Sequence, residues 1–138
     1  MEGSKLVART DDLLAIIEVQ FEAMEPGPKV IMGDFNGPIE AFPTAIALMK
    51  EHGWTDIGND AAKCQGQPGR ATCHTHKDAK ESRIDYILAN SQMTPAITKC
   101  YVDYESDYPT HRPLIIEVMT NLLEKRPMSF RCLPTLQS

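Results

Sequence analysis

Three groups of polar side chains in this sequence combine residue types that can hold a metal ion and move a proton. They are Asp34 with Asn36, Arg83 with Asp85, and the segment 107–111, which begins at Asp107 and ends at His111. Carboxylate and amide oxygens suit a hard cation such as Mg²⁺, and an imidazole can exchange a proton near neutral pH. Taken singly, each group also has an ordinary structural interpretation: an Asx turn, an internal ion pair and a solvated histidine, respectively.

Each group lies at the edge of a segment that is predicted to be a β-strand. The apolar residues 29–32 end just before the first group, the second group opens a strand predicted over 83–89, and a strand predicted over 114–119 follows the third. On the period of two of an extended chain, Arg83 and Asp85 share one face of their strand. Strand ends and the loops beyond them are where a rigid scaffold presents catalytic groups.

Helices are predicted before and after the first group. Thr10 is a suitable N-cap, so the first helix is expected to begin there and to end before Pro26. Its apolar stripe is expected to comprise Leu13, Leu14, Ile17, Phe21 and Met24. A second helix is predicted from Pro43 to Gly53, with Trp54 as a core residue after it. Short strands are expected over 71–75 and 97–104, and residues 124–138 are predicted to form a poorly ordered tail.

Composition indicates one globular domain. The chain has 138 residues, of which 42% are hydrophobic and 24% charged. Its 14 basic and 19 acidic residues give a net charge of −5, which does not favour strong nonspecific nucleic-acid binding. No apolar run reaches the roughly 20 residues of a membrane span, and no membrane partner is expected, so the default is a soluble intracellular protein. The spacing of Cys64, Cys73, Cys100 and Cys132 favours free thiols over a zinc site.

The order of the three groups adds a family resemblance. Residues 33–36 (GDFN), 82–88 (SRIDYIL) and 111–114 (HRPL) resemble the last three motifs of the endonuclease/exonuclease/phosphatase family. The resemblance runs from about residue 9 to 119 and implies an α+β, DNase I-like fold, a four-layer sandwich of two sheets flanked by helices. Residues 1–123 would form only the C-terminal half of that domain, one mainly antiparallel sheet with its helices. Self-association or a separate N-terminal half is then expected, because an isolated half would expose an apolar face.

The resemblance also implies a catalytic set of Asp34, Asn36, Asp85 and His111 and a cofactor, Mg²⁺ or Mn²⁺. Asp34 would position or deprotonate the attacking water, and Asn36 would bind phosphoryl oxygens or a metal-bound ligand. Asp85 would orient His111, which would contact the phosphate as charge develops. Arg83 would support Asp85 from outside the cleft. Asp34 and Asn36 would be metal ligands.

Two departures from the family pattern bear on activity. The residue before the motif histidine is usually a metal-binding carboxylate, and here it is Thr110. Asp107 could replace that ligand if the loop carries an insertion; alternatively, residues 106–107 match the motif and Tyr108 takes the place of the histidine. The continuation through Arg112 favours His111. Nothing before residue 33 matches the asparagine and glutamate that the family's N-terminal half supplies.

The function expected from this resemblance is metal-dependent hydrolysis of phosphate esters. An endonuclease-type phosphodiesterase, with nucleic acid as substrate, is favoured, and weak activity is expected from the incomplete ligand set. One alternative is a non-catalytic remnant or interaction module with the same fold. Another is a small phosphatase acting on a nucleotide or lipid phosphate. Fold alone does not choose among them.

Overall fold

The computed structural model describes residues 2–74 and 80–123. The predicted tail at 124–138 lies outside these residues. Two α-helices are present, α1 (Glu2–Ala23) and α2 (Pro43–Glu51). The strands are β1 (Val30–Asp34), β2 (Thr55–Asp56), β3 (Cys73–His74), β4 (Glu81–Ser82), β5 (Asp85–Ala89), β6 (Ile97–Val102) and β7 (Leu114–Val118). The mixture of helices and antiparallel strands confirms the α+β class.

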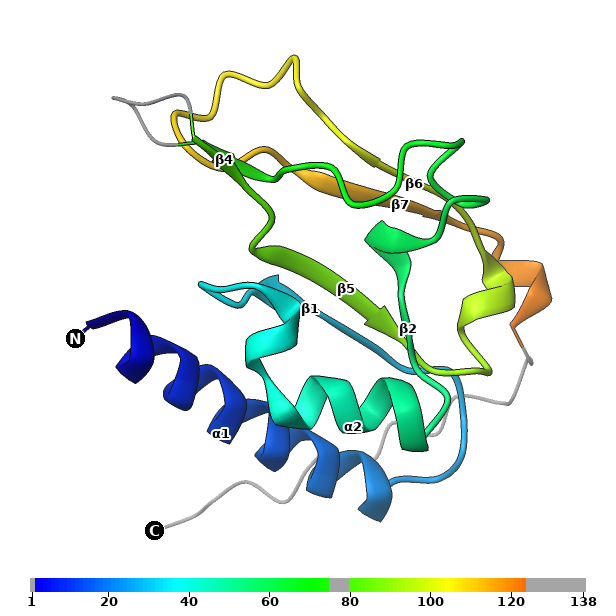
Figure 1. Ribbon diagram of the computed structural model, residues 1–138. Coiled ribbons are helices and arrows are strands. Elements are labelled where there is room, and N and C mark those ends of the chain that lie inside the picture. Colours follow the sequence, from blue (N-terminus) through cyan, green and yellow to red (C-terminus); the bar gives the residue numbers. More distant parts are fainter. Residues whose placement is uncertain (1, 75–79, 124–138) are drawn as a thin grey trace, which may run out of the picture.

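The strands of the described residues form three antiparallel sheets, where the sequence predicted one. The largest has the order β1-β5-β2, and β3 pairs with β4 and β6 with β7. An isolated bridge between Cys73 and His111 links the second ladder to the loop before β7. Figure 1 shows the helices on one side of β1 and β5 and the β6–β7 hairpin on the other. The strands β2, β3 and β4 are only two residues long, so each contributes few paired residues.

The first helix begins eight residues earlier than predicted, at Glu2. Thr10 is therefore inside α1, and its hydroxyl donates a hydrogen bond to the carbonyl of Phe35 at 3.2 Å. Asp11 caps the other helix, because its carboxylate accepts the backbone N–H of Thr44, in the first turn of α2, at 2.9 Å. Thr10 and Asp11 thus join α1 to the elements around it. They do not mark the start of the helix, as the sequence had suggested.

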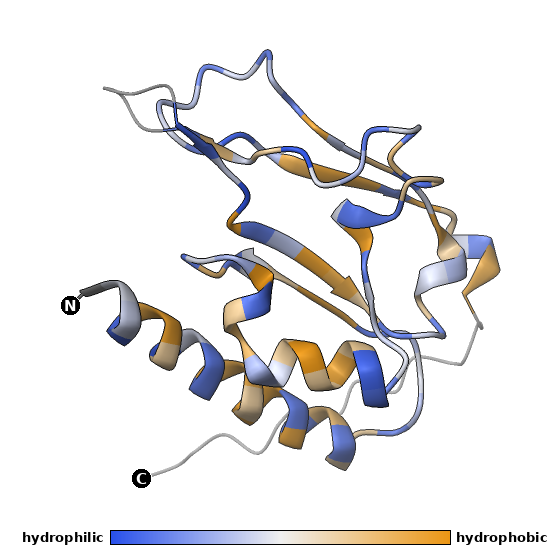
Figure 2. Cartoon of the chain, viewed as in Figure 1, coloured by the Kyte–Doolittle hydropathy of each residue, from blue (hydrophilic) through white to orange (hydrophobic). Residues whose placement is uncertain are grey.

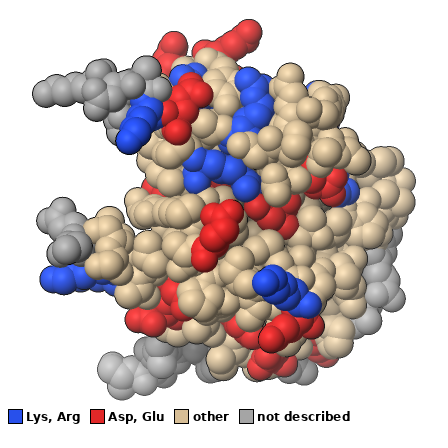
Figure 3. Space-filling view, viewed as in Figure 1, with Lys and Arg blue, Asp and Glu red and all other residues tan. Residues whose placement is uncertain are grey.

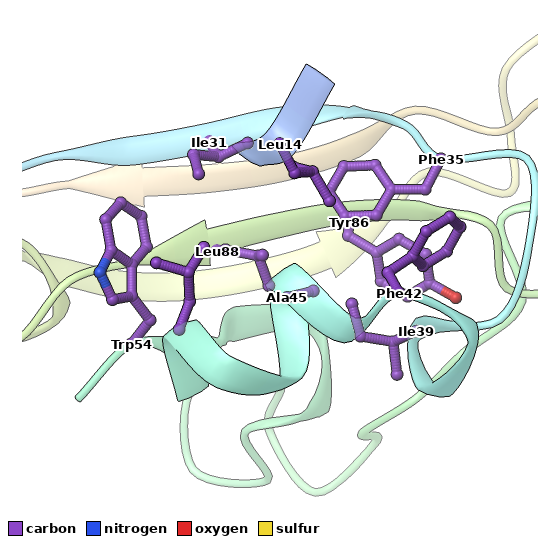
Figure 4. Close-up of a cluster of buried hydrophobic side chains, with 10 residues drawn as sticks. Leu14, Ile31, Phe35, Ile39, Phe42, Ala45, Trp54, Tyr86 and Leu88 are labelled. Atoms are coloured by element: carbon purple, nitrogen blue, oxygen red, sulfur yellow. The ribbon is translucent and has the colours of Figure 1, made fainter. Parts of the chain in front are cut away.

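The helices cover one face of the β1-β5-β2 sheet. Figure 4 shows the buried side chains that α1, α2 and the strands contribute to this layer. Its buried members are Leu14, Ile31, Phe35, Ile39, Phe42, Ala45, Leu48, Trp54, Tyr86 and Leu88. The predicted stripe of α1 is half right: Leu14 is buried and Ile17 and Phe21 pack on this cluster, whereas Leu13 and Met24 are exposed.

A second cluster packs on the opposite face of β5. It comprises Ile57, Cys64, Ile87, Ala89, Met93, Ile97 and Cys100, with residues of β7 beside them. Tyr86 and Leu88 thus face the helices, while Ile87 and Ala89 face the β6–β7 hairpin, as the alternation of a strand requires. Figure 2 shows that β5 changes from hydrophilic at its beginning to hydrophobic along its length. The strand is therefore polar and partly exposed only at its beginning, Asp85.

The surface carries charges of both signs. Basic and acidic side chains are interspersed on the face shown in Figure 3, with no large area of one sign. The same view is hollowed at its left side, which is the side where β1 ends and β5 begins in Figure 1. Neither helix within residues 2–74 and 80–123 has an apolar stretch long enough to cross a lipid bilayer.

Candidate functional site

Two carboxylates face each other where β1 ends and β5 begins. Asp34 is the last residue of β1 and Asp85 the first of β5, and they are direct partners in the antiparallel register. Partners in such a ladder project from the same face of the sheet, and like charges directly opposite one another destabilise it. The Asp34 side chain is 36% exposed and that of Asp85 is 20% exposed, so solvent relieves this repulsion only in part.

His111 lies between these two carboxylates. Its Nδ1 atom is 3.0 Å from Oδ2 of Asp85, and its Nε2 atom is 3.5 Å from Oδ2 of Asp34. The contact between Asp85 and His111 that the sequence predicted is therefore confirmed. One potential ligand atom from each of the three residues lies within 4.8 Å of the others. Among the described residues, this is the group of carboxylates and imidazole close enough to share one cation.

The electrostatics of the site favour a protonated imidazole. The hydrogen bond with Asp85 raises the pKa of His111 above its usual value, and the charges of Asp85 and Asp34 act in the same direction. Burial of the ring opposes this shift without cancelling it. Protonation of His111 would offset the repulsion between the two aspartates.

A groove of about 680 Å³ opens over these residues. Its polar wall includes Asp34, Asp85 and His111, and its remaining wall comes from β1, β5 and the loop before β7. Thr110 and Arg112 line it on either side of His111. The groove is large enough to accept a phosphate group together with part of the molecule that carries it.

Thr72 holds Asp85 in place, and sequence reasoning missed this residue. Its side chain is buried, with 1% exposure, and its hydroxyl accepts the backbone N–H groups of Ile84 and Asp85 at 3.2 and 3.1 Å. Its backbone carbonyl accepts the N–H of Arg112 at 2.7 Å. Thr72 therefore ties the start of β5 to the residue after His111. A threonine in a short predicted strand carries no signal of this role, because threonine is common in strands.

Tyr86 fixes the loop that follows Asp34. Its hydroxyl lies 2.6 Å from the carbonyl oxygen of Arg83 and 2.9 Å from that of Gly37. Burial raises the pKa of Tyr86 to about 12, so the phenol remains a donor at neutral pH. As predicted, the ring packs in the core, where it is 2% exposed.

Arg83 does not support Asp85, in contrast to the prediction. Its guanidinium forms an ion pair with Asp56 and lies 4.8 Å from the centre of the Tyr86 ring. The prediction placed Arg83 and Asp85 on one face of a strand, but β5 begins only at Asp85. Arg83 lies in the irregular segment before the strand, so the alternation of strand faces does not apply to it.

Asn36 and Asp107 lie at the margins of the site. Asp34 accepts the backbone N–H of Asn36 at 2.9 Å, which is the Asx turn that the ordinary interpretation of this pair predicted. Asn36 is exposed and has a φ of 57°, a left-handed conformation that asparagine tolerates. Neither Asn36 nor Asp107 is among the described residues that line the groove. Their roles as metal ligands stay predictions.

The cysteines are not candidates for a nucleophile. Cys64, Cys73 and Cys100 are free thiols, as predicted, and Cys132 lies outside the described residues. Burial raises the pKa of Cys100 to about 12 and also raises the pKa values of Cys64 and Cys73. Because the thiolate is the reactive form, these side chains are poorly suited to covalent catalysis.

Comparison with known proteins identifies a family. Residues 6–107 match the sequence profile described as the Endonuclease/Exonuclease/phosphatase family. The match includes Asp34, Asn36 and Asp85 and ends before His111, so the place of His111 in the site depends on the geometry described above. Searches of curated proteins and of solved structures found no match.

Proposed function

The chain belongs to the endonuclease/exonuclease/phosphatase family, and we propose that it is a divalent-metal-dependent hydrolase of phosphate esters that cleaves phosphodiesters in the manner of an endonuclease. The observation that carries this proposal is the convergence of Asp34, Asp85 and His111. The family has a DNase I-like, phosphoester-hydrolase fold. Cleavage of phosphodiesters and the use of nucleic acid as substrate are our proposals beyond membership of the family.

The donor set fits a hard divalent cation. Asp34 and Asp85 present carboxylate oxygens from directly opposed positions, an arrangement whose repulsion a cation would relieve. Asn36 and Asp107 are the proposed further ligands from the neighbouring loops. When bound, Mg²⁺ or Mn²⁺ would neutralise developing negative charge and lower the pKa of a coordinated water.

The chain's own residues then have distinct tasks. Asp34, whose side chain is more exposed than that of Asp85, would accept a proton from the attacking water. Asp85 would hold Nδ1 of His111, which directs Nε2 toward Asp34 and the groove. The raised pKa of His111 supports a role as a cationic hydrogen-bond donor to the phosphoryl oxygen in the transition state. Asn36 would bind the phosphoryl group from the loop.

We expect weak activity, and one observation favours a non-catalytic alternative. Thr110 offers a neutral hydroxyl at the position where the resemblance expects a carboxylate. The resemblance also places these residues in the C-terminal half of a four-layer sandwich, whose other half would supply a glutamate. The 59% exposure of Met32, which lines the groove, is compatible with a face that another part of such a sandwich covers.

The test is hydrolysis of a small phosphodiester, a phosphomonoester and plasmid DNA by the full chain with Mg²⁺ or Mn²⁺. We expect slow cleavage of the phosphodiester and nicking of the plasmid, both abolished by a chelator and by Asp34→Asn. Preferential cleavage of the phosphomonoester would favour a phosphatase instead. A folded chain that binds no metal and cleaves none of the three substrates would favour the non-catalytic alternative.

A further inference from the structure

Two arginines stack on one tyrosine ring, and one of them, Arg112, lines the groove. The guanidinium carbon of Arg70 lies 4.1 Å from the centre of the Tyr104 ring, and that of Arg112 lies 4.6 Å from it. Neither arginine forms an ion pair within residues 2–74 and 80–123, although three carboxylates flank Tyr104 in the same loop. Both guanidinium groups are therefore available to an anion from solution.

Hydrogen bonds fix this arrangement, and within the described part of the chain they use only some of the guanidinium donors. The Tyr104 hydroxyl donates to the carbonyl of Ala71 at 2.7 Å, which anchors the ring. Arg70 donates to Oε1 of Gln67 at 2.8 Å, and Arg112 makes a long contact of 3.4 Å to the carbonyl of Tyr104. A guanidinium has five N–H donors, so each arginine retains several that can bind phosphate oxygens.

Arg112 connects this stack to the candidate site, whereas Arg70 lines a neighbouring cavity. Arg112 directly follows His111, and both line the groove. Tyr108 lines the same groove and is 66% exposed, an unusual exposure for a large aromatic side chain. A cation and an exposed aromatic ring therefore line the same groove as the residues that would hold the scissile phosphate.

We propose that Arg70, Tyr104, Arg112 and Tyr108 bind a nucleic-acid strand beside the scissile phosphodiester. The two guanidinium groups would bind backbone phosphates that flank the cleavage position, and Tyr108 would stack on a base. The inference rests on the proposed function and deepens it by naming the residues that would bind the strand. Positively charged grooves with aromatic stacking residues are the common physical basis of sequence-tolerant single-strand binding.

A nucleic-acid strand fits these residues better than a lipid headgroup does. A strand presents a phosphate at every nucleotide and a base with a flat face, which matches two separated guanidinium groups and an aromatic ring. Because the net charge is −5, the molecule as a whole repels polyanions. Binding of a nucleic-acid strand therefore requires a local group of cations. The ordinary alternative is that the stack only holds the loop around Tyr104 against the segment around Arg70.

The test measures binding without cleavage. Fluorescence anisotropy would follow a labelled oligothymidine of about 12 nucleotides, a length within the usual site size. The full chain would be titrated in EDTA, so that the result is independent of hydrolysis and of metal binding. We expect Arg70→Gln/Arg112→Gln to weaken binding about tenfold and to reduce the slope of log affinity against log salt by about 1.4, since each phosphate contact to a single strand contributes about 0.7.

Matched variants distinguish a site from general charge. Lys99→Gln also removes a cation that lies over a tyrosine ring, at 5.0 Å from Tyr101 in β6, and should bind as the wild type does. Arg70 is exposed, so Arg70→Gln alone should retain the fold. It should reduce the salt slope by about half as much as the double variant does. Wild-type-like binding by the double variant, or an equal loss in Lys99→Gln, would overturn the proposal. So would binding to phosphoinositide vesicles without binding to the oligonucleotide.

Discussion

His111 contacts two carboxylates at once. Each of its ring nitrogens faces a carboxylate, and the two carboxylates face each other across a β-ladder. A structural ion pair would need only one aspartate. The second one leaves an excess negative charge that suits a cation, and it places a potential base beside the groove.

The pKa of His111 should depend on Asp85. In metal-free protein, the imidazole signals of His111 should titrate above the usual value of about 6.5, and Asp85→Asn should lower the midpoint. NMR titration of the imidazole resonances measures both. Because the folded-state pKa is the higher one, the pairing stabilises the fold below the unfolded-state pKa, and this contribution is lost as pH rises through the folded-state pKa.

Asp107→Asn is the matched control for this titration. Asp107 is an exposed carboxylate in the same loop, and it is not among the groups that raise the pKa of His111. Its removal should leave the midpoint unchanged. An unchanged midpoint in Asp85→Asn, or an equal fall in both variants, would mean that the 3.0 Å contact does not persist in solution.

Thr110→Asp tests whether the loop has only lost a metal ligand. Thr110 lines the groove next to His111, so a carboxylate there would join Asp34 and Asp85. We expect tighter binding of Mn²⁺ by calorimetry, by about tenfold or more, and no gain in the neutral control Thr110→Asn. If Asp107 already serves as the ligand, Thr110→Asp would add little and Asp107→Ala would abolish binding, which would contradict the lost-ligand interpretation.

At the scale of elements, the sequence was informative about strands and less so about boundaries. The apolar runs before Asp34 and after Asp85 predicted β1 and β5, and Pro43 predicted the start of α2. The start of α1 could not be predicted, because Thr10 has the ideal chemistry of a cap. Its actual partner, the carbonyl of Phe35, is 25 residues away.

Long-range pairing also explains the error about Arg83. The local spacing predicted that Arg83 contacts Asp85. Its ion-pair partner is Asp56, which lies 27 residues earlier in the sequence and follows α2. The same holds for Thr72, whose hydroxyl accepts hydrogen bonds from backbone N–H groups 12 and 13 residues further along the chain. Contacts within one strand are visible in a sequence pattern, but contacts between loops are set by the tertiary fold.

Thr72 should be important for both stability and the geometry of the site. Thr72→Val keeps the shape of the side chain and leaves the N–H groups of Ile84 and Asp85 without their acceptor. We expect the free energy of unfolding to fall by about 1–3 kcal/mol in urea denaturation, since buried donors would lose their hydrogen bonds. The midpoint of the His111 titration should shift as well, because Asp85 would lose its support.

Thr72→Ser provides the comparison, because it retains the hydroxyl and removes one methyl group. It should cost about 0.8 kcal/mol or less and should leave the His111 titration as in the wild type. Equal losses of stability in the two variants would indicate that the methyl group, rather than the hydroxyl, accounts for the role of Thr72.

At the scale of the whole molecule, β5 organises both the core and the site. The strand is buried on two faces beyond its first residue, so its backbone is held between the helices and the β6–β7 hairpin. That rigidity fixes Asp85, and the ladder with β1 fixes Asp34 opposite it. The groove lies at the end of the sheet where the packing of both layers stops, which places polar groups at an open but well-supported position.

The central claim is that Asp34 and Asp85 hold one divalent metal ion beside His111. The most direct measurement is paramagnetic broadening by Mn²⁺ in amide NMR spectra of the full chain. We predict that substoichiometric Mn²⁺ first broadens the signals of these three residues and their neighbours Thr72 and Thr110, and that Asp34→Asn/Asp85→Asn removes the effect. Broadening centred on other carboxylates, or the same broadening in the double variant, would contradict the account.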